Sequence, residues 1–258
     1  MRITIDVTMD YQLPRAEPVL LTLAAARTDG QTLEENHLEV EDARLEWIDA
    51  DGMVGQRVWA FLDTPRLVLH YSAAVDVTRP DVPLEALPPT AFGALPAHVI
   101  GHLRPSRFCQ SDLFTAFVAQ KFGQLTGGAK IAAMRDWVAQ EIAYVPGSSN
   151  PATTAIDTFV SRAGVCRDYT HLMCALARAA NIPARYTSAY GIGVNPPDFH
   201  AVAEVWLDGA WHLVDPTGMS RADRMAVISS GQDAVDVAFM ENESGAMPRN
   251  QFIHVASA

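Results

Sequence analysis

Hydrophobic and polar positions alternate along two segments of the first third of the chain. Every second residue is apolar in residues 2–11, and residues 67–77 repeat this pattern. A period of two is typical of half-buried strands. Further strand candidates and turn signals lie between these segments: 19–26, 37–48 and 56–62, with turns at Asp29-Gly30 and Asp51-Gly52. Several short strands without a helical pattern predict an antiparallel β-sandwich domain over residues 1–78.

A proline-rich stretch follows this predicted domain. Residues 79–97 contain five prolines. Proline donates no backbone hydrogen bond and has a fixed φ, so it is disfavoured inside helices and central strands. We therefore expect a linker over 79–97 and a second domain over 98–258.

Beyond the linker the apolar period lengthens to three or four residues, which indicates helices. Ser111 is expected to cap the first helix. The expected helices and strands follow one another in this order: helices near 113–122, 131–142, 156–160 and 166–180, then strands near 184–190, 199–207, 210–215, 225–229 and 250–256. Helices followed by a sheet predict an α+β fold class.

Charge and composition exclude several kinds of partner. The 258 residues are 49% apolar and carry a net charge of -11. Such a chain lacks the basic face that nucleic acids and anionic membranes require. No apolar run approaches the ~20 residues of a membrane span, and the first residues do not form a secretory signal. We expect a cytoplasmic protein with neither nucleic-acid nor membrane partners.

Cysteine and histidine spacing points away from disulfides and metals. The three cysteines are an odd, small set that does not form a disulfide framework. No paired cysteine or histidine spacing suits a metal ion, and no glycine-rich motif suits a phosphate or a dinucleotide. We therefore expect neither a metal nor a cofactor.

Cys166 stands at the predicted start of the helix over 166–180. Unpaired backbone N–H groups and the positive end of the helix dipole favour a thiolate at such a position. The thiolate is the nucleophilic form of cysteine. The alternative is a small buried hydrophobic residue, a role that suits Cys174 inside the same helix.

The dipeptide Asp208-Gly209 predicts a two-residue β-hairpin turn. Counting outward from that turn places Val202 opposite Asp215, so that His200 and Asp215 share one face of the hairpin. Diagonal neighbours lie about 7–8 Å apart at the backbone, within reach of an imidazole and a carboxylate. Taken singly, the histidine also suits an ordinary strand position and the aspartate a strand end.

Cys166, His200 and Asp215 together supply the three parts of a thiol catalytic triad. A thiol nucleophile needs a base that takes its proton, and the base needs an orienting acceptor. The joint pattern therefore favours a catalytic role over three separate structural roles.

Four motifs in this region resemble the transglutaminase-like superfamily: GVCRDY at 164–169, NIPAR at 181–185, FHA at 199–201 and WHLVDPT at 211–217. The resemblance implies a papain-like core with Cys166 as the nucleophile, His200 as the general base and acid, and Asp215 as the orienting residue. The β domain, LRPSR at 103–107 and GQDAVDV at 231–237 resemble a bacterial subgroup described as cysteine proteases. That subgroup tends to carry arginine where Gln232 stands.

The donors of an oxyanion hole are less evident. The backbone N–H of Cys166 is a natural donor at a helix start. Papain uses a glutamine six residues before its cysteine, but Val160 stands there in this chain. Tyr144 and Trp137 are the candidate replacements, and both also suit core positions.

These observations predict an enzyme that attacks an amide carbonyl through a thiol and hydrolyses a peptide or another amide. One alternative is a true transglutaminase that transfers the acyl group to an amine. A second is a binding module that keeps the fold without turnover. The expected partner is the amide substrate, and the β-sandwich domain is expected either to dock substrate or to form a homo-oligomer.

Overall fold

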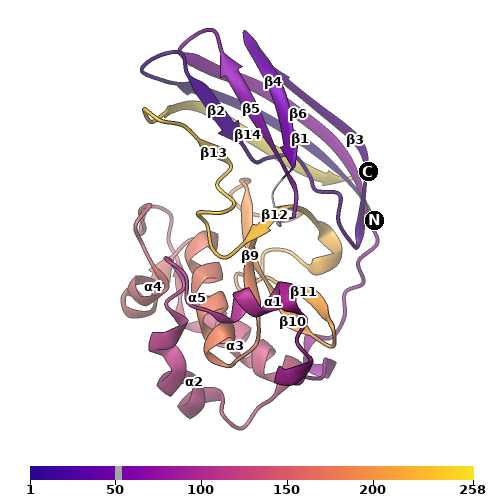
Figure 1. The fold of residues 1–258 in the computed structure, drawn as a ribbon, viewed down its shortest axis with the longest axis vertical. Helices are drawn as coiled ribbons and strands as arrows, with labels where there is room; N and C mark the ends of the chain where they lie inside the picture. The colour runs from indigo at the N-terminus through magenta and orange to yellow at the C-terminus, as the bar shows by residue number, and fades with distance from the viewer. Residues whose placement is uncertain (50–53) are drawn as a thin grey trace.

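The computed structural model describes residues 1–49 and 54–258. Figure 1 shows a layered β region that contains both chain termini and, below it, a region in which helices pack on a further sheet. The predicted α+β class, with a β-rich N-terminal region, is confirmed. The turn predicted at Asp51-Gly52 lies outside the described residues.

The β region consists of two antiparallel four-stranded sheets, with strand orders β14-β1-β6-β3 and β13-β2-β5-β4. Ile3, Ile5, Val7 and Met9 are buried between polar neighbours, as their alternation predicts. The strands have the following bounds: β1 Arg2–Gln12, β2 Pro18–Leu21, β3 Gln31–Val40, β4 Ala43–Asp49, β5 Gln56–Leu62, β6 Arg66–Val77, β13 Met240–Glu241 and β14 Met247–Ser257.

Two features of this region differ from the sequence prediction. The single strand expected over 37–48 is wrong, because β3 ends at Val40 and β4 begins at Ala43. Asp42 turns the chain between them with φ 47°, a left-handed conformation that aspartate tolerates better than most residues. In addition, the C-terminal part of the predicted second domain, residues 98–258, belongs structurally to the β region. Strand β14 pairs along β1 in the first sheet, and β13 pairs with β2 in the second.

The proline-rich stretch over 79–97 contains only short 3-10 turns before α1 (Ala97–Ile100), namely η1 (Leu84–Ala86) and η2 (Phe92–Ala94). This agrees with the disfavoured helix and strand conformations of proline. No helix in the part of the chain that the structure describes is long and apolar enough to cross a membrane.

The second region packs helices against the antiparallel sheet β11-β10-β9-β12. Helix α5 (Cys166–Ala179) lies at its centre, and all residues from Asp168 to Arg178 are buried. Ser111 begins a 3-10 turn and makes no cap hydrogen bond, so the predicted cap is wrong. The other elements have these bounds: η3 Gly101–Leu103, η4 Ser111–Phe114, α2 Thr115–Phe122, α3 Gly127–Glu141, β7 Ala143–Tyr144, α4 Ala155–Ser161, β8 Ala163–Gly164, β9 Ala184–Gly191, β10 His200–Leu207, β11 Ala210–Val214, η5 Ala222–Arg224 and β12 Met225–Gly231.

The two regions share a hydrophobic core. Tyr190 of β9 and Ile228 of β12 are fully buried among the apolar residues of the sandwich. The Tyr190 hydroxyl donates a hydrogen bond to the Leu23 carbonyl at 2.7 Å. The Gln31 side chain bonds the Val227 backbone in both directions, as donor to its carbonyl and acceptor from its N–H. These contacts fix the sandwich against the sheet that carries His200.

Candidate active site

The β10–β11 hairpin positions the predicted base and its orienting residue. Asp208 and Gly209 have φ 49° and 75°, as a type I′ turn requires at both central residues. The strands pair from Leu207 opposite Ala210 to Ala203 opposite Val214. This is the predicted register, and one further step places Asp215 beside the strand that begins at His200.

His200 and Asp215 form a buried hydrogen-bonded pair. The His200 Nε2 donates to the Asp215 Oδ2 at 2.9 Å, and the two residues are 1% and 8% exposed. Asp215 also accepts hydrogen bonds from the Thr217 N–H and hydroxyl and from the Ser220 N–H. Burial alone would raise the pKa of Asp215, but these hydrogen bonds outweigh it and hold that pKa below its ordinary value. Asp215 is therefore a carboxylate that can orient the imidazole.

The other nitrogen of His200 is available for proton exchange. The His200 Nδ1 is buried and has no hydrogen-bond partner among the described residues. Burial lowers the pKa of His200, but Asp215 and the Cys166 sulfur together outweigh it and raise that pKa to about 9. The imidazole thus exchanges its proton on the side of Cys166 while its Nε2 stays bound to Asp215.

The start of α5 is built around a close approach of two residues. The Asp168 side chain folds back and accepts a hydrogen bond from the Val165 N–H at 2.9 Å. A Cβ on Gly164 would lie 2.7 Å from the Asp168 Cβ, so only glycine leaves room for this cap. Cys166 is the first helical residue, and its own N–H has no partner within the helix. Cys166 is half-buried, whereas Cys109 and Cys174 are buried.

Of the two aromatic candidates for the oxyanion hole, the structure brings only Tyr144 to Cys166. Strand β7 pairs with β8 so that Tyr144 lies opposite Gly164, two residues before the cysteine. Desolvation and then the charge of Cys166 raise the pKa of Tyr144 to about 12, so its hydroxyl remains a proton donor.

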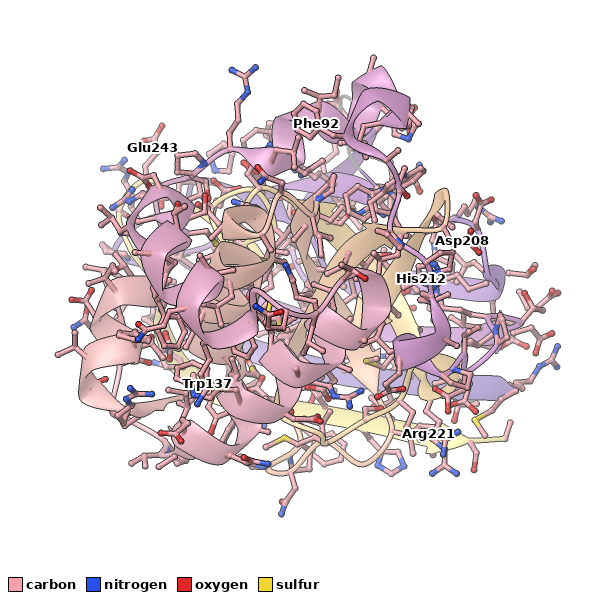
Figure 2. All side chains as sticks on the ribbon, turned by 90° about the horizontal axis from the view of Figure 1, so that it is seen from below. Phe92, Trp137, Asp208, His212, Arg221 and Glu243 are labelled. Carbon is pink, nitrogen blue, oxygen red and sulfur yellow. The ribbon has the colours of Figure 1, made fainter. Side chains whose placement is uncertain are left out.

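Trp137 does not lie at the site. Its ring packs in an aromatic cluster with Phe117 and Phe159, at centroid distances of 5.0 and 5.8 Å. The Arg162 guanidinium lies 5.0 Å from its centroid. Figure 2 labels Trp137 on the helical side of the molecule. Trp137 does not line the cavity of Cys166, and its helical period corresponds to a position in the aromatic cluster.

Cys166 and His200 open on one cavity of about 800 Å³. Both regions of the molecule contribute to its walls. From the sandwich and the C-terminal segment come Tyr11, Thr22, Phe239, Met240 and Gln251, and from the helical region come Arg107, Phe108, Arg167, Tyr186, Asp198 and Phe199. The sandwich residues could not be predicted as part of the site, because no local sequence pattern indicates which distant strand faces it.

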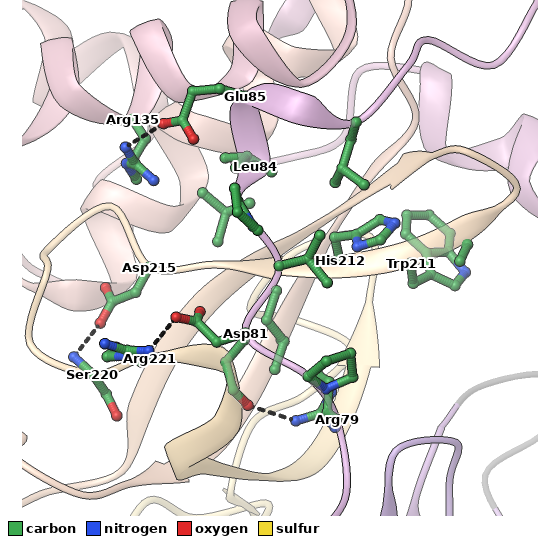
Figure 3. Close-up of a pocket in the computed structure, with 18 of the residues that line it drawn as sticks. Arg79, Asp81, Leu84, Glu85, Arg135, Trp211, His212, Asp215, Ser220 and Arg221 are labelled. Atoms are coloured by element: carbon green, nitrogen blue, oxygen red, sulfur yellow. Dashed lines mark hydrogen bonds and ion pairs between the residues drawn. The ribbon is translucent and has the colours of Figure 1, made fainter.

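A second cavity of about 630 Å³ includes Asp215 in its lining but neither Cys166 nor His200 (Figure 3). Its charged residues already have partners. Arg135 pairs with Glu85, and Arg221 pairs with Asp81. Of the two cavities, the first is the one lined by both Cys166 and His200.

Two further polar residues lie outside the first cavity, and only His171 contacts residues that line it. His171 is fully buried, and burial lowers its pKa to about 3, so it is neutral. Its ring stacks on Phe108 and its Nε2 accepts a hydrogen bond from the Ala234 N–H. Gln232 does not line the cavity, and its backbone carbonyl accepts a hydrogen bond from Arg178.

Within residues 1–49 and 54–258 no group of three or more potential ligands is arranged to hold a metal ion.

Comparisons with known proteins agree with this architecture. Residues 116–216 match the family model of the transglutaminase-like superfamily. A crystal structure of a candidate cysteine protease from Cytophaga hutchinsonii superposes with a TM-score of 0.90 at 31% identity, covering 100% of this chain and 90% of that one.

Curated relatives from mycobacteria match over shorter stretches. An uncharacterised protein of Mycobacterium leprae (strain TN) is 31% identical over 120 residues, which are 43% of this chain and 42% of the relative. An uncharacterised protein of Mycobacterium tuberculosis (strain ATCC 25618 / H37Rv) is 28% identical over 175 residues, which are 60% of this chain and 54% of the relative. The matches thus span about half the length of these relatives.

Proposed function

The chain belongs to the transglutaminase-like superfamily, and we propose that it is a cysteine-dependent enzyme that hydrolyses an amide bond, as a protease or an amidase does. Cys166 is the nucleophile, His200 is the general base and acid, and Asp215 orients the imidazole. The observation that carries this proposal concerns the two nitrogens of His200: its Nε2 is held by Asp215, and its buried Nδ1 has no hydrogen-bond partner among the described residues. His200 and Cys166 line the same cavity.

The proposed reaction proceeds through an acyl-enzyme. The raised pKa of His200 favours a resting pair in which the proton of Cys166 has passed to the His200 Nδ1, and the Cys166 thiolate attacks the carbonyl carbon of the substrate amide. The tetrahedral intermediate collapses, the C–N bond breaks, and the leaving amine takes the proton from His200. A water molecule then gives a proton to His200 and attacks the thioester, the C–S bond breaks, and the site returns to the Cys166 thiolate and protonated His200 as the carboxylic acid leaves.

The negative oxygen of the tetrahedral intermediate needs hydrogen-bond donors that are already in place. The Cys166 N–H at the start of α5 supplies one. The Tyr144 hydroxyl, which stays protonated beside Cys166, supplies the second. Replacement by Tyr144→Phe would remove this donor and keep the aromatic ring.

A panel of peptide and amide substrates, assayed with the wild type and with Cys166→Ala, tests the proposed function. We expect the wild type to release a carboxylic acid from at least one amide and Cys166→Ala to lose at least 10³-fold of that rate. The matched controls Cys109→Ala and Cys174→Ala change buried thiols and should keep most of the activity.

Alkylation gives a second measurement on the same proteins. Iodoacetamide should label Cys166 before the other two cysteines, because the thiols of Cys109 and Cys174 are buried. Turnover that persists in Cys166→Ala, or preferential labelling of Cys174, would contradict the proposed nucleophile.

A further inference from the structure

The cavity beside Cys166 contains a carboxylate that the proposed thiol chemistry does not use. Asp198 is the only acidic side chain among the lining residues that the structure describes. It lies two residues before His200, at the end of the loop between β9 and β10. Across residues 1–49 and 54–258 no arginine, lysine or histidine forms an ion pair with it.

The sandwich holds this carboxylate in place. The Tyr11 hydroxyl of β1 donates to the Gln251 Oε1 at 2.6 Å, and the Gln251 Nε2 of β14 donates to the Asp198 Oδ1 at 2.8 Å. The Phe199 N–H donates to the same oxygen at 2.7 Å. The Oδ1 of Asp198 is therefore occupied, and the Oδ2 has no partner among the described residues.

The surroundings of Asp198 favour a positively charged ligand. Asp198 is exposed where it lines the cavity, so its Oδ2 is open to a ligand from solvent, and partial burial by the cavity walls raises its pKa while the hydrogen bonds from Phe199 and Gln251 oppose that shift. Phe199 and Phe239 stack on each other at 5.0 Å in the wall of the same cavity, so the wall beside Asp198 offers apolar contact to the carbon chain of a cationic group.

The positively charged side chains that line the cavity lie around Phe108. The guanidinium groups of Arg107 and Arg167 each lie 5.1 Å from its ring centroid. Backbone carbonyls of Asn150 and Thr153 hold Arg167 there. These guanidinium groups repel a cation from the part of the cavity near Phe108. We therefore expect a cationic group to bind in the part near Asp198.

We propose that Asp198 is a specificity-determining residue that binds a cationic group of the substrate, a primary ammonium or a guanidinium, next to the amide that Cys166 attacks. This inference rests on the proposed function, since it assumes that the substrate occupies the cavity of Cys166. It gives the β-sandwich domain a role, which is to position the binding carboxylate through Tyr11 and Gln251.

Charged thiol reagents test the proposal without any turnover. Aminoethyl methanethiosulfonate carries an ammonium group, and ethyl methanethiosulfonate is neutral. Each transfers its alkylthio group to a thiolate and releases methanesulfinate. The rate constant for modification of Cys166 is measured for both reagents by mass spectrometry, and the ratio of cationic to neutral rate is compared among variants.

We expect Asp198→Asn to lower this ratio about five-fold, as the loss of one nearby charge predicts. Gln251→Leu removes the hydrogen bond from the sandwich and should lower the ratio by a smaller factor. The matched control is Asp208→Asn, which makes the same charge change at the hairpin turn, at the far end of β10 from His200. Its ratio should equal that of the wild type.

The outcomes separate this proposal from the proposed function. An unchanged ratio in Asp198→Asn, with Cys166 still reactive, overturns the cation site and leaves the thiol chemistry standing. Equal slowing of both reagents also overturns it, because that is a general disturbance of the cavity. A Cys166 that reacts with neither reagent in the wild type overturns the proposed nucleophile and this inference with it.

Discussion

The protonation of His200 is set by a balance among its neighbours. Burial disfavours the imidazolium, whereas the Asp215 carboxylate and the Cys166 sulfur favour it strongly enough to raise the pKa from 6.5 to about 9. Because the folded pKa lies above the ordinary value, the protonated imidazole stabilises the fold fully below about pH 6.5. That contribution is lost as the pH rises through about 9.

The same balance predicts the alkaline limb of the activity profile. The leaving amine takes its proton from His200, so kcat/KM should fall above about pH 9 as the imidazolium is lost. Asp215→Asn should move this limb to lower pH and reduce the rate by about 10²–10⁴-fold, because the imidazolium loses its carboxylate partner. The measurement is kcat/KM against pH for both proteins, with Asp112→Asn as an exposed control of equal charge change. An alkaline limb that does not move in Asp215→Asn would contradict the assigned roles.

Among the elements, the start of helix α5 depends on Gly164 more than on any helical propensity. A Cβ at this position would meet the Asp168 Cβ at 2.7 Å, so the capping side chain would have to leave the Val165 N–H. We expect Gly164→Ala to lower the free energy of unfolding by about 1–3 kcal/mol, the usual cost of overpacking. It should also slow modification of Cys166 by iodoacetamide. Urea unfolding measures the first effect.

Gly93→Ala is the matched control for this substitution. A Cβ on Gly93 would meet nothing within 4 Å, so its unfolding midpoint should stay near that of the wild type. Equal midpoints for Gly164→Ala and the wild type would show that Asp168 can move at little cost.

Sequence patterns predicted the elements whose signals are local. The Asp208-Gly209 turn determined the register that brings His200 to Asp215, and both residues have the left-handed conformation that the turn requires. Periodicity found α5 and its first residue, Cys166. The same periodicity could not separate Trp137 as a core residue from Trp137 as a donor, because an apolar face is expected in both cases.

Contacts between distant elements lay beyond these patterns. Alternation in residues 250–256 indicated a strand, but not that β14 pairs with β1 at the other end of the chain. For the same reason Tyr11 and Gln251 could not be assigned to the cavity of Cys166. A strand pattern reports which face is buried and leaves open which partner buries it.

At the scale of the whole molecule, the sandwich and the catalytic region act as one unit. Tyr190 and Ile228 are buried in the sandwich core, and Gln31 bonds the Val227 backbone. The cavity between the regions therefore keeps its shape only while both are folded together.

Hydrolysis and amine transfer share the acyl-enzyme, so the triad alone does not decide between them. A transferase must exclude water from the thioester and admit an amine, usually by closing the site. The segment best placed to do so is the loop over 192–198, but five of its seven residues are exposed and only Asp198 lines the cavity. We therefore expect water to react with the thioester faster than an amine does. The carboxylic acid should be the main product even with a primary amine present at millimolar concentration. The ratio of carboxylic acid to amine adduct formed from a good amide substrate measures this competition.

A majority of amine adduct, absent in Cys166→Ala, would contradict hydrolysis and leave the fold and the triad standing. If Asp198→Asn then removed the adduct alone, the cation that Asp198 binds would be the acceptor amine rather than part of the acyl donor.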